Sequence, residues 1–321
     1  MKRFLRNVIL LILTVGACFG SLALFDRFVV GPQYTFNYQA SLLDKLARLE
    51  SIKEPKIILV GHSNLSFGMD SAMLEEAMGM PVVNLGLHGG LGNAFHEEIA
   101  KNTIREGDIV IVCHSSFSDT DEITDASLAW ITLDNHEGMW KLIRKKDYPV
   151  MIKAYPEYLR NSLFLWFTGS GNIDAGGCFS RSAFNAYGDV VFKPEYGQMD
   201  VDEYFASTGV SVPLIGDVCI DRLNEYNRFI RDRGATMLVA GYPIAYGKDS
   251  SFSEEDFAAF GRELRERLDC EVISDYEDYF YPYAFFYNTD LHLTEEGTEA
   301  RTRQLISDLK RWQEGTGGRE Q

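Results

Sequence analysis

Three residues in the sequence have the side-chain types that acyl-transfer chemistry requires: Ser63, Asp290 and His292. Ser63 lies in the stretch IILVGHSNLSFGMDS, directly after an apolar run and Gly61-His62. Asp290 and His292 lie two residues apart in NTDLHLTEEG, near the C-terminus. A serine hydroxyl becomes a strong nucleophile when a histidine takes its proton, and a carboxylate orients that histidine. These residues form a candidate catalytic triad if the fold brings the two segments together.

The nearest generic motif around Ser63 is the G-x-S-x-G elbow of α/β-hydrolases, in which a sharp strand-to-helix turn exposes the serine. The fifth position is here Leu65 rather than glycine. The elbow also normally follows several strands, whereas this segment is expected to be the first strand of its domain. An α/β-hydrolase is therefore disfavoured. A serine after a strand is also commonly only a turn or helix-cap residue.

The elements that would position these residues alternate along the chain. Apolar runs that predict buried strands are KIILVG, PVVNLGL and DIVIVC, and later ATMLVAGYP and CEVISD. Amphipathic segments between them predict helices, one of which is closed by Gly79. Continuous apolar strands separated by helices indicate a parallel sheet covered on both faces. We therefore expect an α/β fold with a doubly wound parallel sheet and a large insertion after its third strand.

Ligands of such sheets bind beyond the carboxyl ends of the strands. Ser63 follows the first strand, and the glycine-rich NLGLHGG and the polar CHSSFSD end the second and third. Asp290 and His292 precede the last helix, for which Thr294 is the expected N-cap. Residues i and i+2 of an extended segment point the same way, so Asp290 could orient His292. These blocks should meet at one rim of the sheet.

The order of the blocks resembles that of the SGNH (GDSL-like) hydrolase superfamily, over residues of about 55–118 and 217–312. More narrowly, it is similar to membrane-anchored bacterial members that modify envelope polymers, such as alginate O-acetyltransferases and the D-alanyl transfer protein of lipoteichoic-acid synthesis. The resemblance implies a flavodoxin-like fold, Ser63 as nucleophile, and Asp290 and His292 as its partners. It also implies that the backbone amides of Ser63 and Gly89 stabilise the oxyanion.

Two features depart from the family pattern. The usual D-x-x-H spacing is D-x-H here, as in the alginate acetyltransferase branch. The third-block asparagine, a second oxyanion donor, is missing after DIVIVC. Substitutes for it are Asn93, His114, Ser115 and Ser116.

The resemblance implies an extracytoplasmic serine O-acyltransferase or esterase that acts on an envelope polysaccharide through an acyl-serine, with no cofactor. The alternative is a catalytically silent scaffold that binds polysaccharide or a membrane acyltransferase. The intact Ser, Asp and His favour the enzyme, and the missing asparagine favours the scaffold. No spacing among the six histidines is typical of a metal site, so no metal is expected. His62, His88, His96 and His136 are expected to be structural or surface residues.

The N-terminus predicts a membrane anchor. Residues 8–25 are uncharged and mostly apolar, long enough as a helix of about 27 Å to cross most of a bilayer core. Lys2, Arg3 and Arg6 precede them, which places the N-terminus in the cytoplasm and the body outside. A cleaved signal peptide and a lipoprotein box ending at Cys18 are the alternatives. A retained single-pass anchor in the cell membrane is favoured, because the apolar run continues well past Cys18.

Charge and composition restrict the partners. The formal net charge is −16, and because residues 1–30 carry +3, the remainder carries −16 − 3 = −19. A body this acidic repels the phosphate backbone, so nucleic acid is disfavoured as a partner. An acyl donor made in the cytoplasm would have to reach the body through a membrane protein, and the resemblance suggests a membrane-bound O-acyltransferase. The five scattered cysteines favour buried thiols over disulfides or zinc.

The insertion contains Trp130, Trp140 and Trp166, and its most apolar stretch is SLFLWF. The aromatic side chains are expected to pack the insertion against the sheet, with sugar stacking as the alternative. SLFLWF is either a core helix or an exposed patch that faces lipid or a membrane partner. The expected organisation is an anchor (1–30), an amphipathic lead-in (31–54), the first part of the domain (55–118), the insertion (119–216), the second part (217–314) and a disordered tail (315–321).

Overall fold

The fold was analysed in a computed structural model of residues 1–321, which describes all residues except 102, 121–122, 135–137, 172, 175, 248–249 and 318–321. Its centre is a five-stranded, all-parallel sheet in the order β2-β1-β3-β4-β6. The strands are β1 (Ile57–Val60), β2 (Val82–Asn84), β3 (Ile109–Val112), β4 (Thr236–Val239) and β6 (Glu271–Val272). The expected α/β architecture with a parallel sheet is confirmed.

Helices cover both faces of this sheet because every central strand is apolar on both sides. Ile57, Leu59 and Ile111 pack on one face against Leu74 of α4 and Leu305 of α11. The opposite residues of the same strands join a larger core with α2, α5, α9 and α10. The helices of this part are α2 (Ser41–Ser51), α3 (Ser63–Ser66), α4 (Ser71–Met78), α5 (Asn93–Lys101), α9 (Asp217–Arg231), α10 (Glu254–Arg267) and α11 (Glu295–Gly317).

The strand order reverses between β1 and β3, which are hydrogen-bonded neighbours in register from Ile57↔Ile109 to Val60↔Val112. From β1 the chain passes to β2 on one side, and then to β3, β4 and β6 on the other. A crevice beyond the carboxyl ends of the strands forms at such a switch point. Ser63 follows β1 at this point.

Two small sheets lie outside the main one. Strands β5 (Ile244–Tyr246) and β7 (Phe280–Pro282) pair in parallel, and β8 (Phe286–Thr289) and β9 (His292–Leu293) form an antiparallel hairpin. The hairpin leads directly into α11, whose first turn is capped by the Thr294 hydroxyl, which accepts from the Gly297 amide at 3.3 Å. Thr294 is thus the N-cap expected from the sequence. The helix continues to Gly317, further than the end near Trp312 that the sequence suggested.

The segment 119–216 contains α6 (Ala126–Asp134), α7 (Tyr148–Thr168) and α8 (Val201–Ser207), joined by long irregular stretches. One of these stretches runs along the outer edge of β2: the Asn84 amide donates to the Tyr187 carbonyl at 3.0 Å. Asp189 accepts from Ser71 and from the Asn84 side chain. The insertion therefore packs along the β2 edge of the sheet and covers it.

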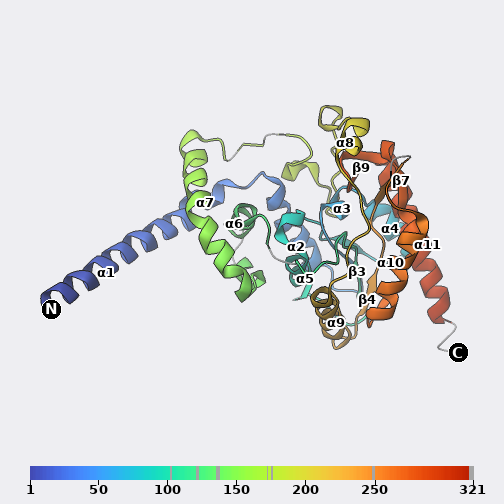
Figure 1. The fold of residues 1–321 in the computed structure, drawn as a ribbon, viewed down its shortest axis with the longest axis horizontal. Coiled ribbons are helices and arrows are strands. Elements are labelled where there is room, and N and C mark those ends of the chain that lie inside the picture. The colour runs from blue at the N-terminus through green and yellow to red at the C-terminus, as the bar shows by residue number, and fades with distance from the viewer. Residues whose placement is uncertain are drawn as a thin grey trace.

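Helix α1 (Lys2–Phe25) projects from the body, as Figure 1 shows at the blue end of the chain, and none of its residues is buried. Within the described part of the chain it begins the one stretch, Lys2–Gln33, that is long and apolar enough to span a membrane. A π-helical turn, Asp26–Val30, continues it into the body. All five cysteines are free thiols, and Cys113, Cys178 and Cys219 are buried.

Candidate active site

The turn that carries Ser63 requires a close approach between β1 and β3. A Cβ atom on Gly61 would lie 3.0 Å from the Cys113 carbonyl oxygen, so only glycine fits without a shift. Asn64 then donates from its side-chain amide to the same carbonyl at 3.0 Å. After His62 the chain turns at once into α3, so Ser63 is its first residue and its amide lacks an intrahelical partner.

A fully buried arginine of helix α11 contacts this turn. Arg301 donates to the backbone carbonyls of Asn64, Gly68 and Gly241. A guanidinium has enough donors to satisfy several carbonyls at once, which suits it to bind the end of a short helix. The nucleophile turn is thus tied to the sheet by Asn64 and to the last helix by Arg301.

His292 lies in β9 and reaches the serine. Its Nε2 atom is 2.8 Å from Ser63 Oγ, across 229 positions of sequence. Its other ring nitrogen, Nδ1, is 2.6 Å from the side-chain oxygen of Asn288. When Nδ1–H donates to that amide oxygen, Nε2 has a free lone pair and accepts the Ser63 proton. Phe67 stacks on the imidazole with ring centroids 4.0 Å apart, which fixes the plane of the ring.

The structure does not place Asp290 behind His292, so the expected geometry of the third residue is wrong. Asp290 and Leu291 form the turn of the β8–β9 hairpin instead of extended backbone, and therefore the i and i+2 side chains do not share a face. Asp290 accepts a hydrogen bond from the Tyr204 hydroxyl at 3.1 Å. Asn288, on the strand before the turn, occupies the position expected of the acid.

The electrostatics follow from this neutral partner. Burial, with smaller contributions from the nearby Lys193 and His88, lowers the pKa of His292 to about 3. A carboxylate at Nδ1 would oppose that shift, but the Asn288 amide carries no charge. His292 is therefore neutral at pH 7 and able to accept a proton, whereas an imidazolium formed on proton transfer would have a neutral amide at Nδ1.

Of the residues expected to stabilise an oxyanion, Gly89 and Asn93 lie beside the nucleophile turn. Gly89 opens the 3₁₀ turn Gly89–Leu91, and its Cβ position lies 3.5 Å from the His62 ring, beside the nucleophile turn. The Asn93 side chain is hydrogen-bonded to His62 and donates to the Ser116 carbonyl at 2.8 Å. In this part of the described chain, no hydrogen bond joins Asn93, Ser116 or His114 to Ser63.

His114 binds Glu97 rather than Ser63. It is fully buried and bonded through Nε2 to Glu97 at 3.0 Å, and Arg222 binds the same carboxylate. The Ser116 hydroxyl is 3.2 Å from that of Ser118. The Ser63 amide at the start of α3 and Gly89 beside His62 remain the expected backbone donors, and the side-chain oxygen of Asn93 contacts His62. Ser115, the remaining substitute, follows His114 in the loop after β3.

Three histidines gather behind the nucleophile turn: the ring of His62 lies 5.0 Å from that of His96 and 5.6 Å from that of His114. Burial lowers the pKa of each of them, that of His62 to about 3. Over the described residues, no group of His, Cys, Asp and Glu side chains is arranged to hold a metal ion. His96 is fully buried and His62 partly buried, while His88 is exposed and His136 lies outside the described residues.

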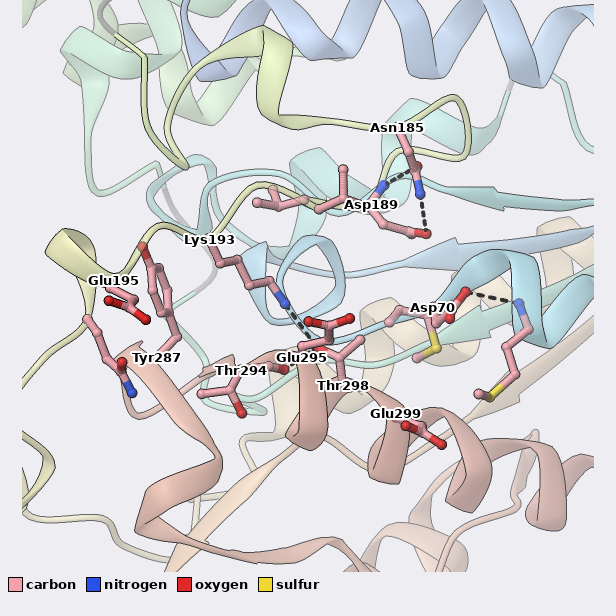
Figure 2. Close-up of a pocket in the computed structure, with 15 residues that line it drawn as sticks. Asp70, Asn185, Asp189, Lys193, Glu195, Tyr287, Thr294, Glu295, Thr298 and Glu299 are labelled. Atoms are coloured by element: carbon pink, nitrogen blue, oxygen red, sulfur yellow. Dashed lines mark hydrogen bonds between the residues drawn. The ribbon is translucent and has the colours of Figure 1, made fainter.

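A cavity of about 630 Å³ lies between the insertion and the start of α11 (Figure 2). Lys193 points into this region and donates to the Phe67 carbonyl at 2.8 Å and to the Thr298 hydroxyl at 2.9 Å. Carboxylates, among them Asp70, Glu295 and Glu299, line part of the wall together with apolar and neutral polar residues. The lining residues do not include Ser63 or His292, so this cavity is not the reaction centre.

No protein-family model matches the chain, and no curated protein matches its sequence. The function is therefore argued from the geometry of Ser63, His292 and Asn288.

Sequence reasoning missed Asn288 and Arg301. In YNTDLHL, Asn288 lies four residues before His292, and the turn at Asp290 and Leu291 between β8 and β9 brings its side chain to the imidazole. A pattern of single residues gives no signal for that turn. Arg301 had no signal, because a basic residue on an amphipathic helix is usually solvated.

Proposed function

We propose that the chain is a membrane-anchored serine O-acyltransferase or esterase of the SGNH type that acts outside the cytoplasm on an envelope polysaccharide. The observation that carries the proposal is the 2.8 Å contact between Ser63 Oγ and His292 Nε2 at the carboxyl edge of a parallel sheet. Such a pair, with its histidine oriented by a third group, is the arrangement that activates a serine. The sheet order and the chain positions of Ser63 and His292 also agree with the resemblance drawn from sequence.

The reaction has two steps. His292 Nε2 takes the Ser63 proton as Oγ attacks the acyl carbonyl, and the backbone amides of Ser63 and Gly89 stabilise the oxyanion. The bond to the donor's leaving oxygen then breaks, and His292 returns the proton to that oxygen, which leaves an acyl-Ser63. A sugar hydroxyl or water attacks this ester in the same way and regenerates the serine.

Packing at the end of α1 supports a retained anchor. Directly after the helix, Asp26 accepts from the Tyr155 hydroxyl at 3.0 Å and Arg27 donates to the Asp134 carbonyl at 2.9 Å. Gln33 donates to the Ser162 carbonyl at 3.0 Å. Because the residues directly after the apolar helix are already part of the folded body, α1 joins that body without an unstructured spacer.

The second candidate is a catalytically silent scaffold that binds polysaccharide or a membrane acyltransferase. The neutral Asn288 and the low pKa of His292 favour it, because both weaken the base. The hydrogen bond between Ser63 and His292 favours the enzyme.

Turnover of p-nitrophenyl acetate by the full-length, detergent-solubilised protein separates the two candidates. The enzyme predicts a loss of at least about 10³-fold in Ser63→Ala and in His292→Ala, and a double variant little worse than either, because the pair acts as a unit. The control is Ser307→Ala, an exposed serine on α11. Turnover that is equal in Ser63→Ala and in the control would favour the scaffold.

A further inference from the structure

The exposed side of α7 has an apolar end. Phe164 and Phe167 are 66% and 77% exposed, and the partly exposed Trp166 lies between them. The opposite side of the same helix packs inward through Tyr158, Leu159 and Ser162. The stretch SLFLWF is therefore neither wholly core nor wholly surface: Ser162 is buried, the two leucines are half-buried, and the three aromatic side chains are exposed. Solvent-exposed groups of this kind mark an interaction surface.

This surface adjoins the end of the apolar helix. The Phe25 ring, in the last turn of α1, meets the Trp166 ring edge-on at 5.6 Å between centroids, and Trp166 in turn meets Phe167 at 5.1 Å. Phe28, just past the helix, is 68% exposed. Figure 1 shows α7 running across the end of α1 rather than along it. If α1 spans a bilayer, α7 lies at the level of the lipid headgroups.

The charge of the segment agrees with that position. Residues 139–168 contain six basic and two acidic side chains, a net +4, so the rest of the chain carries −16 − 4 = −20. Lys153 and Arg160 are exposed on α7, on the turns before Phe164, and Arg160 is 3.6 Å from Glu157. Four of the six basic residues lie before α7, and the helix itself has two basic residues and one acidic one. A net basic segment with exposed aromatic groups at its end suits the interface of a bilayer that contains anionic lipid.

We propose that the C-terminal half of α7 lies in the outer interface of the membrane that α1 spans, with Phe164 and Phe167 below the headgroups and Lys153 and Arg160 among anionic ones. The inference rests on the proposed anchor and not on the proposed chemistry of Ser63. A spanning helix alone leaves the body free to tilt and rotate. A second contact through α7 fixes the face that the body turns to the membrane.

The test places a fluorophore at one position of the full-length chain. Cys18 and the partly exposed Cys270 are first replaced by serine, and then Phe167→Cys or Arg303→Cys is introduced and labelled with an environment-sensitive nitrobenzoxadiazole probe. Arg303 is an exposed residue of α11, which Figure 1 shows on the side of the body away from α1. Each protein is reconstituted in phosphatidylethanolamine–phosphatidylglycerol vesicles, with or without a lipid that carries a doxyl quencher near the headgroup.

The proposal predicts that the doxyl lipid quenches the probe at position 167 by about half or more, and that aqueous iodide quenches it several-fold less than the probe at 303. If iodide quenches both probes equally while the protein floats with the vesicles after carbonate extraction, α7 lies in water and the proposal is overturned with the anchor intact. Failure to float overturns the proposal together with the anchor. Ester turnover of the same samples reports on Ser63 independently of either result.

Discussion

Among single residues, Asn288 has the largest influence on the chemistry proposed for His292. Its side-chain oxygen lies 2.6 Å from Nδ1, where a serine hydrolase usually has a carboxylate. The amide can hold the tautomer and orientation of the ring, but it cannot balance the charge of an imidazolium. The site is therefore arranged for proton transfer and yet has a weak base.

Substitutions at Asn288 and Asp290 separate their roles. Asn288→Ala should lower turnover of an ester by about 10²–10⁴-fold, because the ring loses the group that orients it. Asp290→Asn should stay within about 3-fold of the native protein, because Asp290 contacts Tyr204 and not His292. Steady-state kinetics measure both. A large loss in Asp290→Asn together with a small one in Asn288→Ala would restore Asp290 as the orienting group.

Asn288→Asp tests the electrostatic part of this account. A carboxylate at Nδ1 should raise the pKa of His292 from about 3 and stabilise the imidazolium. We expect turnover to rise by roughly 10-fold and the acid limb of the pH–rate profile to move to higher pH. The sign follows because His292 acts as a base and loses function once it is protonated. A limb that moves to lower pH, or does not move, would contradict this account.

At the scale of elements, the sequence predicts the meeting of Ser63 and His292 but not the arrangement around them. The apolar strands and intervening helices require a parallel sheet, and Ser63 and His292 both lie where such a sheet binds ligands. The choice between Asn288 and Asp290 depends on whether the segment is extended or a two-residue hairpin. Pairing of β8 with β9 decides that, and a pattern of single residues does not show it.

The contacts of the insertion could likewise not be predicted from the sequence. Residues 185–193 contain no strand or helix pattern, yet Asp189 binds Ser71 and Asn84, and the Val190 amide donates to the Ser66 carbonyl at 2.7 Å. These contacts join polar groups that are distant in the chain, so they produce no periodic pattern in the sequence. They make the insertion a support of the nucleophile turn.

Arg301 links α11 to that turn, and its removal should be costly. Arg301→Leu leaves buried carbonyls of Asn64, Gly68 and Gly241 without a donor, and each unsatisfied group costs about 1–3 kcal/mol. We expect a loss of about 3 kcal/mol or more in the free energy of unfolding, measured by urea denaturation. The control Arg303→Leu removes an exposed pair with Glu299 and should cost less than about 1 kcal/mol. Equal losses would show that Arg301 does not hold the turn.

For the whole molecule, the buried neutral histidines predict sensitivity to acid. The pKa of His96 is well below its usual range, chiefly through burial. The unfolded chain therefore binds more protons than the folded one below about pH 6.5, and stability falls as the pH drops. One such group lowers the free energy of unfolding by about 2 kcal/mol between pH 7 and pH 5.

His96→Gln isolates this contribution, because a glutamine amide can still donate to the His88 carbonyl that His96 Nε2 contacts at 3.3 Å. Urea denaturation of the solubilised protein at pH 7 and pH 5 should show a loss on acidification that is about 2 kcal/mol smaller in His96→Gln than in the native chain. Other groups that titrate in this range cancel in the comparison. An identical loss in both proteins would mean that His96 binds a proton without unfolding.

Reaction of the full-length protein with a fluorophosphonate probe, read by mass spectrometry of its peptides, tests the central claim most directly. An activated serine reacts and an ordinary hydroxyl does not. The account predicts that the adduct forms on Ser63, that Ser63→Ala removes it, and that His292→Ala slows it by at least about 10²-fold. Ser307→Ala should be labelled like the native protein. No adduct on Ser63, or an equal rate in His292→Ala, would contradict the claim that His292 activates Ser63 for acyl transfer.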